Sequence, residues 1–337
     1  MRITTANAFE SSVSNLQRRQ QALTQAQEQL TSGKRVNKPS DDPAATAAAE
    51  RALAAESRSK AQLRALDSSR QAMQQSESAL GEAGELMQQA RELLVSAGNG
   101  TYTDVNRKVI GEALRGLRDD LLAVANRSDG AGRFIFGGQG ADSNPLLDGP
   151  SGVRYDGASG QLMGASGEAS PLSLDGQAAW LLAPDASNPG STLSVFDVMD
   201  RMVGELLTPG RTPAQISATV SRGLGDIDST ANNLSAWRAR TGEALNRIDG
   251  IGQRLSQTTL DAQRDRSDAE DLDLLQAISD FQNKQTGYDA ALKACGPRPA
   301  KIQCKVISDI AAATSAARWN TLSARHRSRS ACSENRK

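Results

Sequence analysis

Histidine and cysteine are missing from most of this chain. The sequence has 337 residues, and its three cysteines and one histidine all lie beyond residue 294. Without histidine, residues 1–294 cannot form a histidine-based catalytic triad or a zinc site of the His-Glu-x-x-His type. They also contain no Gly-x-x-x-x-Gly-Lys-Ser/Thr phosphate loop, and the glycine-rich run at 136–140 is typical of a turn. We therefore expect no enzyme, and no catalytic, cofactor or metal site.

Aromatic residues and long apolar runs are also scarce. Aromatics make up only 3% of the chain, too few for a large globular core, and this favours narrow helical bundles. No run of about 18 apolar residues is present, so we expect no membrane insertion, and no cleaved signal peptide is visible at the start. The net charge of zero gives no general attraction to nucleic acid.

What the sequence does have is a heptad pattern at each end of its main body. Apolar residues recur at alternating steps of four and three over 9–30, with Gln20 and Gln27 among them, and again after residue 273. This spacing is typical of helices that pack lengthwise against other helices. We expect the two seams to pair with each other or with neighbouring copies through Phe9, Val13, Leu16, Leu23, Leu30, Leu274, Ile278, Phe281, Tyr288 and Leu292.

The first seam is too small to hold its helix firmly in a lone chain. Its large apolar side chains contribute roughly 1.5–3 kcal/mol each when fully buried. Ordering about 25 residues costs roughly 1–2 kcal/mol per residue in backbone entropy. We therefore expect this helix to be loose in the monomer and firm when several neighbours surround it. Gln20 and Gln27 fit this interpretation, because polar core positions weaken a helix pair but fix its register.

Between the seams, the sequence predicts long helices and a small β-rich insertion. A heptad stripe from Leu66 to Leu94 indicates a very long helix over 43–96, and a helix over 103–126 should fold back on it. Glycine and proline are dense over 128–190, where 133–136 and 152–155 are typical of hairpin strands. A short amphipathic helix over 193–207 precedes a last long helix, whose seam weakens over 259–271 at a kink or a domain boundary.

The composition changes sharply at residue 295. Residues 295–337 hold nine Lys and Arg against two Asp and Glu, a net charge of +7, whereas the rest holds 30 against 37, a net charge of −7. Pro297 and Pro299 should end the last heptad helix. We interpret 295–337 as the product of a frameshift or misjoined reading frame. The alternative is a real, disordered basic tail.

The turn between the first two helices carries the most specific motif. Its residues are typical of a helix end, a break and a new helix start: Gly33, Pro39, Ser40, Asp41, Asp42 and Pro43. The two aspartates could bind a cation, but a helix cap before Pro43 is the favoured interpretation. The run Leu30–Pro43 strongly resembles the bacterial flagellin superfamily, as do the start Met1–Thr5 and the segment Gly132–Gly138.

The resemblance covers residues 1–294 and implies a structural role. Members of the superfamily have terminal helices that are disordered in the monomer and that pair in the inner wall of a hollow tube on assembly. The Pro-Ser-Asp-Asp-Pro form is similar to subunits at the junction of hook and filament. The resemblance then implies a ring of copies, with hook-associated protein 1 and flagellin as neighbours. It also implies unfolded export through the flagellar type III apparatus with an export chaperone, and an extracellular place in the bacterial flagellum.

The expected fold class is mainly α: a long antiparallel helical bundle or coiled coil from both chain ends with a small β-rich middle domain, as in flagellin. The resemblance divides it into an N-terminal inner-core helix, a long helix with its return helix, a β-rich outer domain, the return of the helical domain, a C-terminal inner-core helix and the atypical tail. These parts are expected over 1–42, 43–127, 128–192, 193–260, 261–294 and 295–337.

Two other functions remain open at this point. One is a filament flagellin, against which Pro39, Pro43 and the modest length of the middle domain argue. The other, from a different class, is an intracellular coiled-coil regulatory or signalling protein. Recovery of the secreted chain in flagellar fractions would exclude the second alternative.

Overall fold

The computed structural model describes the chain except for residues 1–2, 131, 142, 165–167, 169 and 295–337, and without the side chains of 3–9 and 294. The predicted tail at 295–337 therefore lies outside the described residues. The chain forms two compact units. One combines residues up to Glu50 with those from Asp265 onward, and the other comprises Arg51–Arg264. The fold is mainly helical, with two small antiparallel sheets, so the expected fold class is confirmed.

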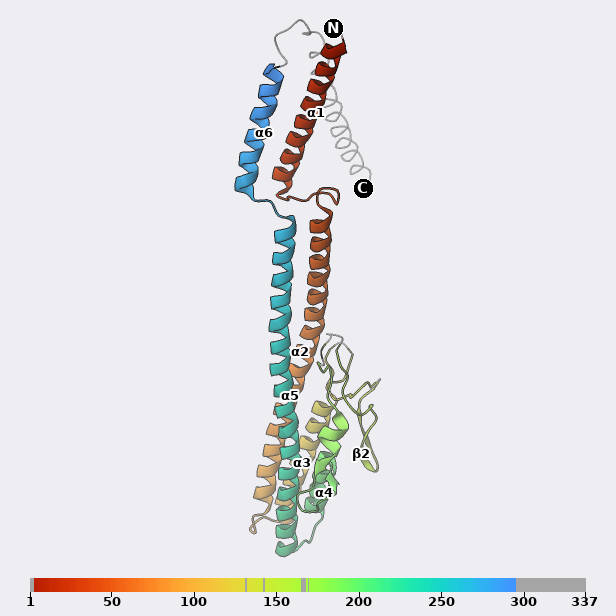
Figure 1. Ribbon diagram of the computed structural model, residues 1–337. Coiled ribbons are helices and arrows are strands. Elements are labelled where there is room, and N and C mark those ends of the chain that lie inside the picture. Colours follow the sequence, from red (N-terminus) through yellow and green to blue (C-terminus); the bar gives the residue numbers. More distant parts are fainter. Residues whose placement is uncertain (1–2, 131, 142, 165–167, 169, 295–337) are drawn as a thin grey trace, which may run out of the picture. The chain divides into compact units, whose positions relative to one another are not determined.

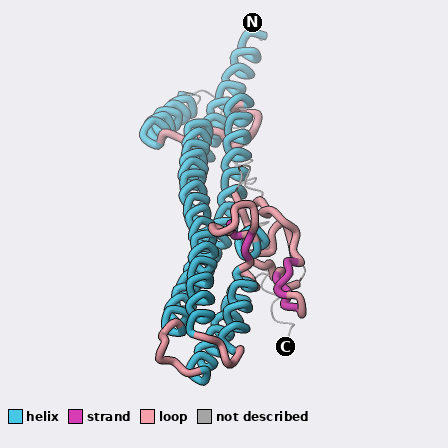
Figure 2. Tube along the Cα trace, turned by 90° about the horizontal axis from the view of Figure 1, so that it is seen from below, coloured by secondary structure: helices cyan, strands magenta, loops and turns pink. Residues whose placement is uncertain are grey.

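Two long helices, α2 (Pro43–Ala97) and α5 (Pro213–Glu270), are the main elements of the second unit. They run side by side in both Figure 1 and Figure 2. Salt bridges at 3.0 Å between Arg91 and Asp228 and at 2.9 Å between Arg70 and Asp249 show that the pairing is antiparallel. The seven-residue stripe predicted on α2 is fully buried in this unit, which confirms it as core: Leu66, Met73, Leu80, Met87 and Leu94.

A shorter helix pair, α3 (Asp104–Ala125) and α4 (Val195–Leu207), packs beside the long helices. Thr103 and Ser194 cap their N-termini, since each side-chain oxygen accepts a hydrogen bond from a backbone N–H of the first turn. A Cβ at Gly111 of α3 would lie 3.1 Å from a methyl of Leu207, so glycine permits close approach to α4. Val109 is 65% exposed, whereas Ile110 and Gly111 after it are buried.

The β-rich insertion is small and partly irregular. Its hairpin joins β1 (Leu146–Gly149) to β2 (Gly152–Tyr155), and β3 (Ala183–Pro184) pairs with β4 (Thr192–Leu193). A π-helical turn, η1 (Gln177–Leu181), lies between them in sequence. The strand expected over 133–136 is wrong: only an isolated bridge from Phe134 to Ser128 forms there. The chain turns at once at Ile135–Phe136, where the Gly137 N–H donates to the Phe134 carbonyl at 3.1 Å, and this leaves too few extended residues for a ladder.

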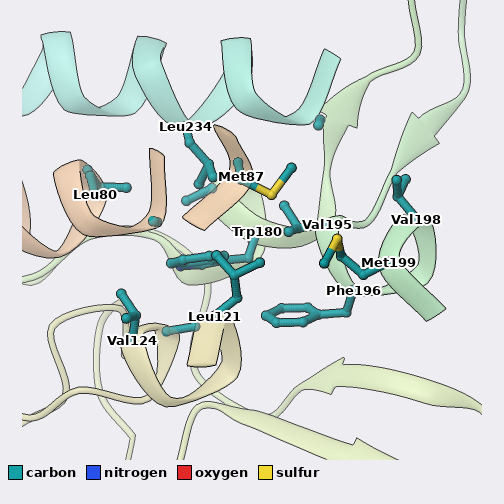
Figure 3. Close-up of a cluster of buried hydrophobic side chains, with 14 of the residues drawn as sticks. Leu80, Met87, Leu121, Val124, Trp180, Val195, Phe196, Val198, Met199 and Leu234 are labelled. Carbon is teal, nitrogen blue, oxygen red and sulfur yellow. The ribbon is translucent and has the colours of Figure 1, made fainter. Parts of the chain in front are cut away.

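Trp180 of η1 is the centre of the core that joins this insertion to the helices. Its ring makes an edge-to-face contact with Phe136 at 5.3 Å and stacks on Phe196 at 5.9 Å between centroids. Figure 3 shows Met87 and Leu121 beside it. All five side chains are fully buried. In a chain with few aromatics, this trio concentrates the large rings where three elements meet.

Arg118 of α3 is the main polar link in the same region. Its side chain is only 8% exposed and binds Asp148 of β1 at 2.5–2.7 Å and Asp200 of α4 at 3.1 Å. The hydrogen bonds from Arg118 hold the pKa of Asp148 below its ordinary value, against a smaller opposing effect of burial. One guanidinium therefore ties α3, the hairpin and α4 together.

Replacing Arg118 with methionine should destabilise the second unit. At pH 7, Arg118→Met should lower the free energy of unfolding by about 1–3 kcal/mol, since two carboxylates that partly face solvent lose their partner. The loss should shrink as the pH falls through the lowered pKa of Asp148, because the native ion pair is then lost in the parent chain as well. Urea unfolding at several pH values measures both effects. Arg115→Met, which removes an exposed pair on the same helix, should change stability by less than about 0.5 kcal/mol at every pH.

Gly138 should be the least replaceable glycine of the insertion. Its φ is 63°, and a Cβ there would collide with the carbonyl oxygen of Ala158. We expect Gly138→Ala to cost more than about 2 kcal/mol in urea unfolding, from backbone strain and the clash together. The matched change Gly140→Ala meets no atom within 4 Å and should be nearly neutral. Equal stability of the two variants would contradict this account.

Candidate assembly surface

The two ends of the main body pair with each other in the first unit. Helix α1 (Ile3–Ser32) packs against α6 (Leu274–Ala294), as Figure 1 shows. The pairing is antiparallel: Gly33, just after α1, bonds to Leu272 just before α6, and Arg19 lies against Gly287. A Cβ at Gly287 would lie 2.8 Å from the Arg19 guanidinium, so the two helices are close there.

The predicted seam of α1 is only partly covered by α6. Val13, Leu16, Leu23 and Leu30 are each half-buried, whereas Ala26 between them is buried. The side chain of Phe9 lies outside the described residues. Gln20 and Gln27 are exposed to solvent and do not lie in the contact with α6. Ala26, next to Gln27, takes the buried position instead, so the side of α1 that faces inward is the side that carries Leu16, Leu23 and Leu30.

The seam of α6 is more exposed still. Phe281 and Tyr288 are half-buried against α1, but Leu274, Ile278 and Leu292 keep 46–55% of their surface exposed. Leu275 next to them is 84% exposed, which sequence reasoning did not single out. Large apolar side chains gathered on one helix in this way are typical of a surface that another protein covers. Whether this surface takes part in assembly stays a prediction.

A clamp of backbone hydrogen bonds closes the α1–α6 pair at its base. Gly33 ends α1 in the left-handed conformation expected of it, with φ at 70°. Lys34 and Asp271 form an antiparallel bridge, the Arg35 N–H donates to the Glu270 carbonyl at 2.7 Å, and the Leu272 N–H donates to the Gly33 carbonyl at 3.0 Å. The last seam was expected to weaken over 259–271. Helix α5 instead continues to Glu270, and the break lies at 271–273, which gives α5 and α6 separate ends.

Side chains reinforce this clamp on both sides. Lys34 pairs with Glu270 at 2.5 Å. The Arg35 guanidinium donates to the Ala269 carbonyl at 2.8 Å and pairs with Asp42 at 3.1 Å. Arg35 thus links the end of α5 to the start of α2. These pairs are partly exposed, so each contributes little by itself and mainly fixes geometry.

The two aspartates of the motif have separate structural tasks. Asp41 accepts hydrogen bonds from the backbone N–H groups of Asn37 and Lys38 and so folds the loop that contains Pro39 and Ser40. Asp42 caps α2, which begins at Pro43, by accepting from Ala44 and Ala45. The cap expected before Pro43 is therefore Asp42. The Ala45 N–H and then the Arg35 side chain hold the pKa of Asp42 below its ordinary value.

Other kinds of site find no support in the part of the chain that the structure describes. No group of three or more His, Cys, Asp or Glu side chains there could hold a metal ion. Among those same residues, no helix is long and apolar enough to cross a membrane.

Removing the Asp42 cap should loosen the start of α2. In Asp42→Ala, the amide protons of the first turn after Pro43 should exchange several-fold faster at pH 7, because two backbone donors lose their acceptor. Because the pKa of Asp42 is lowered, its carboxylate in the parent chain stays ionised within and above the ordinary aspartate pH range. The cap is lost only as the pH falls through the lowered pKa. Hydrogen exchange followed by NMR measures this. Ser40→Ala, at an exposed side chain of the same loop, should leave the exchange rates unchanged.

Several known proteins are similar to this chain in sequence. The family model of the bacterial flagellin N-terminal helical region matches residues 3–141. Flagellar hook-associated protein 3 of Escherichia coli (strain K12) is 29% identical, over 87% of this chain and 96% of that protein. The protein of the same name from Salmonella typhimurium is 27% identical, over 87% and 95% respectively. Flagellin of Listeria monocytogenes is 25% identical, over 79% and 84%.

Solved structures share the fold. A putative flagellar hook-associated protein from Vibrio parahaemolyticus superposes with a TM-score of 0.60 at 20% identity, over 68% of this chain and 100% of that one. FlgL of Xanthomonas campestris gives a TM-score of 0.54 at 22% identity, over 65% and 99%. With this fold, a match to the flagellin N-terminal helical region and similarity along most of its length, the chain resembles bacterial flagellins and flagellar hook-associated protein 3.

Proposed function

We propose that this chain is a structural subunit of the bacterial flagellum that joins the hook to the filament. The observation that carries the proposal is the combination of full-length similarity to flagellar hook-associated protein 3 with the incompletely covered α1–α6 pair. Relatives of that name match over 95–96% of their own length, so the similarity extends through the insertion as well as the terminal helices. A joining subunit needs no active site, and its chemistry is that of contact surfaces.

The exposure of the α6 seam supports assembly through the terminal helices. In the lone chain, α1 covers one side of α6 and leaves Leu274, Leu275 and Ile278 open to water. Burying a large apolar side chain contributes roughly 1.5–3 kcal/mol. The gain is repeated at every copy when copies pack around one another. The seam residues of both helices are the proposed contact residues, with Phe9 among them.

The partners and route follow from the same proposal. The chain forms a ring of copies between hook-associated protein 1 on the hook side and flagellin on the filament side. It reaches this extracellular place unfolded, through the flagellar type III export apparatus, with a chaperone bound to its C-terminal part. Terminal helices that are only partly covered suit such a route, because they are released at low free-energy cost and become firm after assembly.

Complementation tests the proposal directly. A motile host that lacks its own hook-associated protein 3 should regain filaments and swimming when it makes this chain. A second version, in which a heptad helix continues after Ala294 in place of residues 295–337, examines the C-terminal segment separately. Counts of cells with filaments and swim-ring diameters are the measurements. As a control for the contact surface, Ile278→Asp should abolish filaments, whereas Gln253→Glu on the exposed face of α5 should not.

Either version restoring filaments would support the joining role. Rescue by the second version alone would mean that residues 295–337 impair an otherwise competent subunit. Failure of both, with the chain made and exported at normal levels, would overturn the proposal. Retention of the chain inside the cell would favour an intracellular coiled-coil protein instead.

A further inference from the structure

A stripe of uncharged polar side chains runs along α1, beside the face that contacts α6. It consists of Gln20, Thr24, Gln27 and Thr31, at steps of four, three and four, and all of them are exposed. These steps place the four side chains on one side of the helix over about three turns. The stripe is thus as regular as the apolar seam beside it, although its chemistry differs.

The loop that folds over the end of α1 makes this stripe one wall of a groove. Two adjoining hollows of about 520 Å³ and about 480 Å³ lie between α1 and the loop. Thr24 and Glu28 line both from the helix, and Asn37 and Lys38 line both from the loop. A largely exposed salt bridge joins Lys38 of the loop to Glu28 of the helix at 3.5 Å. The groove belongs wholly to the first unit.

The composition of this face is unusual for a helix exposed to water. Such faces ordinarily carry charged residues, yet Glu28 is the only charged residue from Gln20 to Ser32. The Thr24 and Thr31 hydroxyls donate to carbonyls of their own helix. Within the described residues, the side-chain amides of Gln20 and Gln27 have no hydrogen-bond partner. Removing water from amides and hydroxyls costs less free energy than removing it from charged groups, provided that the amides and hydroxyls find hydrogen-bond partners.

A second stripe of the same chemistry lies on α6. Gln276, Ser279, Asn283 and Thr286 recur at steps of three, four and three, and all are exposed. Lys293 continues the line of the stripe seven residues after Thr286, and the Gln276 amide donates a hydrogen bond to Asp280, one turn away, at 3.2 Å. Ala277, Phe281 and Tyr288 are partly buried, and helical geometry places this stripe on the opposite side of α6 from them. Neither stripe can therefore be satisfied by the other within one copy.

We propose that the α1 stripe of one copy binds the α6 stripe of a second copy in the assembled ring. This inference rests on the proposed function and names the surface by which neighbouring copies recognise each other. The two stripes match in spacing and in chemistry, since amides and hydroxyls each offer both donors and acceptors. Regular polar pairs between helices fix their register, whereas apolar seams slide more readily.

The contact is heterologous, because one copy uses α1 and its neighbour uses α6. A heterologous contact leaves an unused α1 stripe at one end and an unused α6 stripe at the other, so copies add in sequence until a ring closes. A contact of α1 with α1 would instead stop at a dimer. The arrangement of the stripes on two different helices therefore fits a ring and disfavours a closed pair.

A charge-swap experiment tests this contact in the complemented host, using whichever version of the chain restores filaments. Gln20→Glu with Gln27→Glu places two negative charges seven residues apart on the α1 stripe. Ser279→Lys with Thr286→Lys places two positive charges at the same spacing on α6. Each double change alone should reduce the fraction of cells with filaments by at least about tenfold, because unpaired charges are buried at every contact. The four changes together in one chain should restore most of the loss, because unlike charges then meet between copies.

Two controls separate assembly from folding. Circular dichroism and thermal unfolding of the purified variants should match those of the parent chain, since all four positions are exposed in the lone copy. Gln253→Glu with Ser256→Glu adds the same charge to an exposed face of α5 and should leave filaments unaffected.

The possible outcomes are distinct. Filaments in the parent with no loss in either charged variant would overturn this contact and leave the joining role intact. Loss in both charged variants without recovery in the combined chain would overturn the pairing of α1 with α6. If the unaltered chain restores no filaments in either version, the joining role fails and this inference fails with it.

Discussion

The antiparallel pairing of α2 with α5 is the interaction on which the rest of the structure depends. A stripe of five large apolar side chains on α2 is completely buried in the core that α2 and α5 form with the elements packed against them. Segments more than 200 residues apart in sequence come together because the chain leaves along one helix and returns along the other. Loop closure over such a distance costs entropy only slowly with length, so a long insertion between the helices is tolerated. The β-rich insertion can accordingly be irregular, provided that the Trp180 core and Arg118 attach it to the helices.

The first unit works on a different principle, with few buried side chains and many directional bonds. Its helices share a half-covered seam, and its base is held by the hydrogen bonds of 33–36 with 269–272. A well-defined base with an incompletely covered surface combines two properties that assembly requires. The base sets which residues of α1 and α6 lie opposite each other, and the open surface supplies free energy once neighbours arrive. The polar stripes add a means of choosing the correct neighbour and register.

Much of this architecture could be predicted from the sequence because it is periodic. The stripe from Leu66 to Leu94, the helix ends at Gly33 and Pro43, and the break before Leu274 all follow from local rules of helix geometry and capping. The placement of Gln20 and Gln27 could not be predicted, since a repeat along one helix does not say which side faces its partner. Trp180 was also missed, because its burial depends on Phe136 and Phe196, which are distant in sequence and brought near only by folding. The irregular course of 133–136 likewise depends on a turn whose close contacts are with Ala158 and Leu174.

The clamp between Gly33 and Leu272 has a consequence for how such sequences can diverge. Its principal donors and acceptors are peptide groups, which every residue except proline supplies in full. Mutations along 34–36 and 269–272 can therefore change side chains widely while the joint keeps its geometry. Two conditions apply: no proline replaces a residue whose N–H donates, and residue 33 can still adopt the left-handed conformation. A joint made in this way sets few demands on composition. Sequences that share little identity can then keep the same joint at the base of the α1–α6 pair, and sequence change can concentrate on the surfaces that select partners.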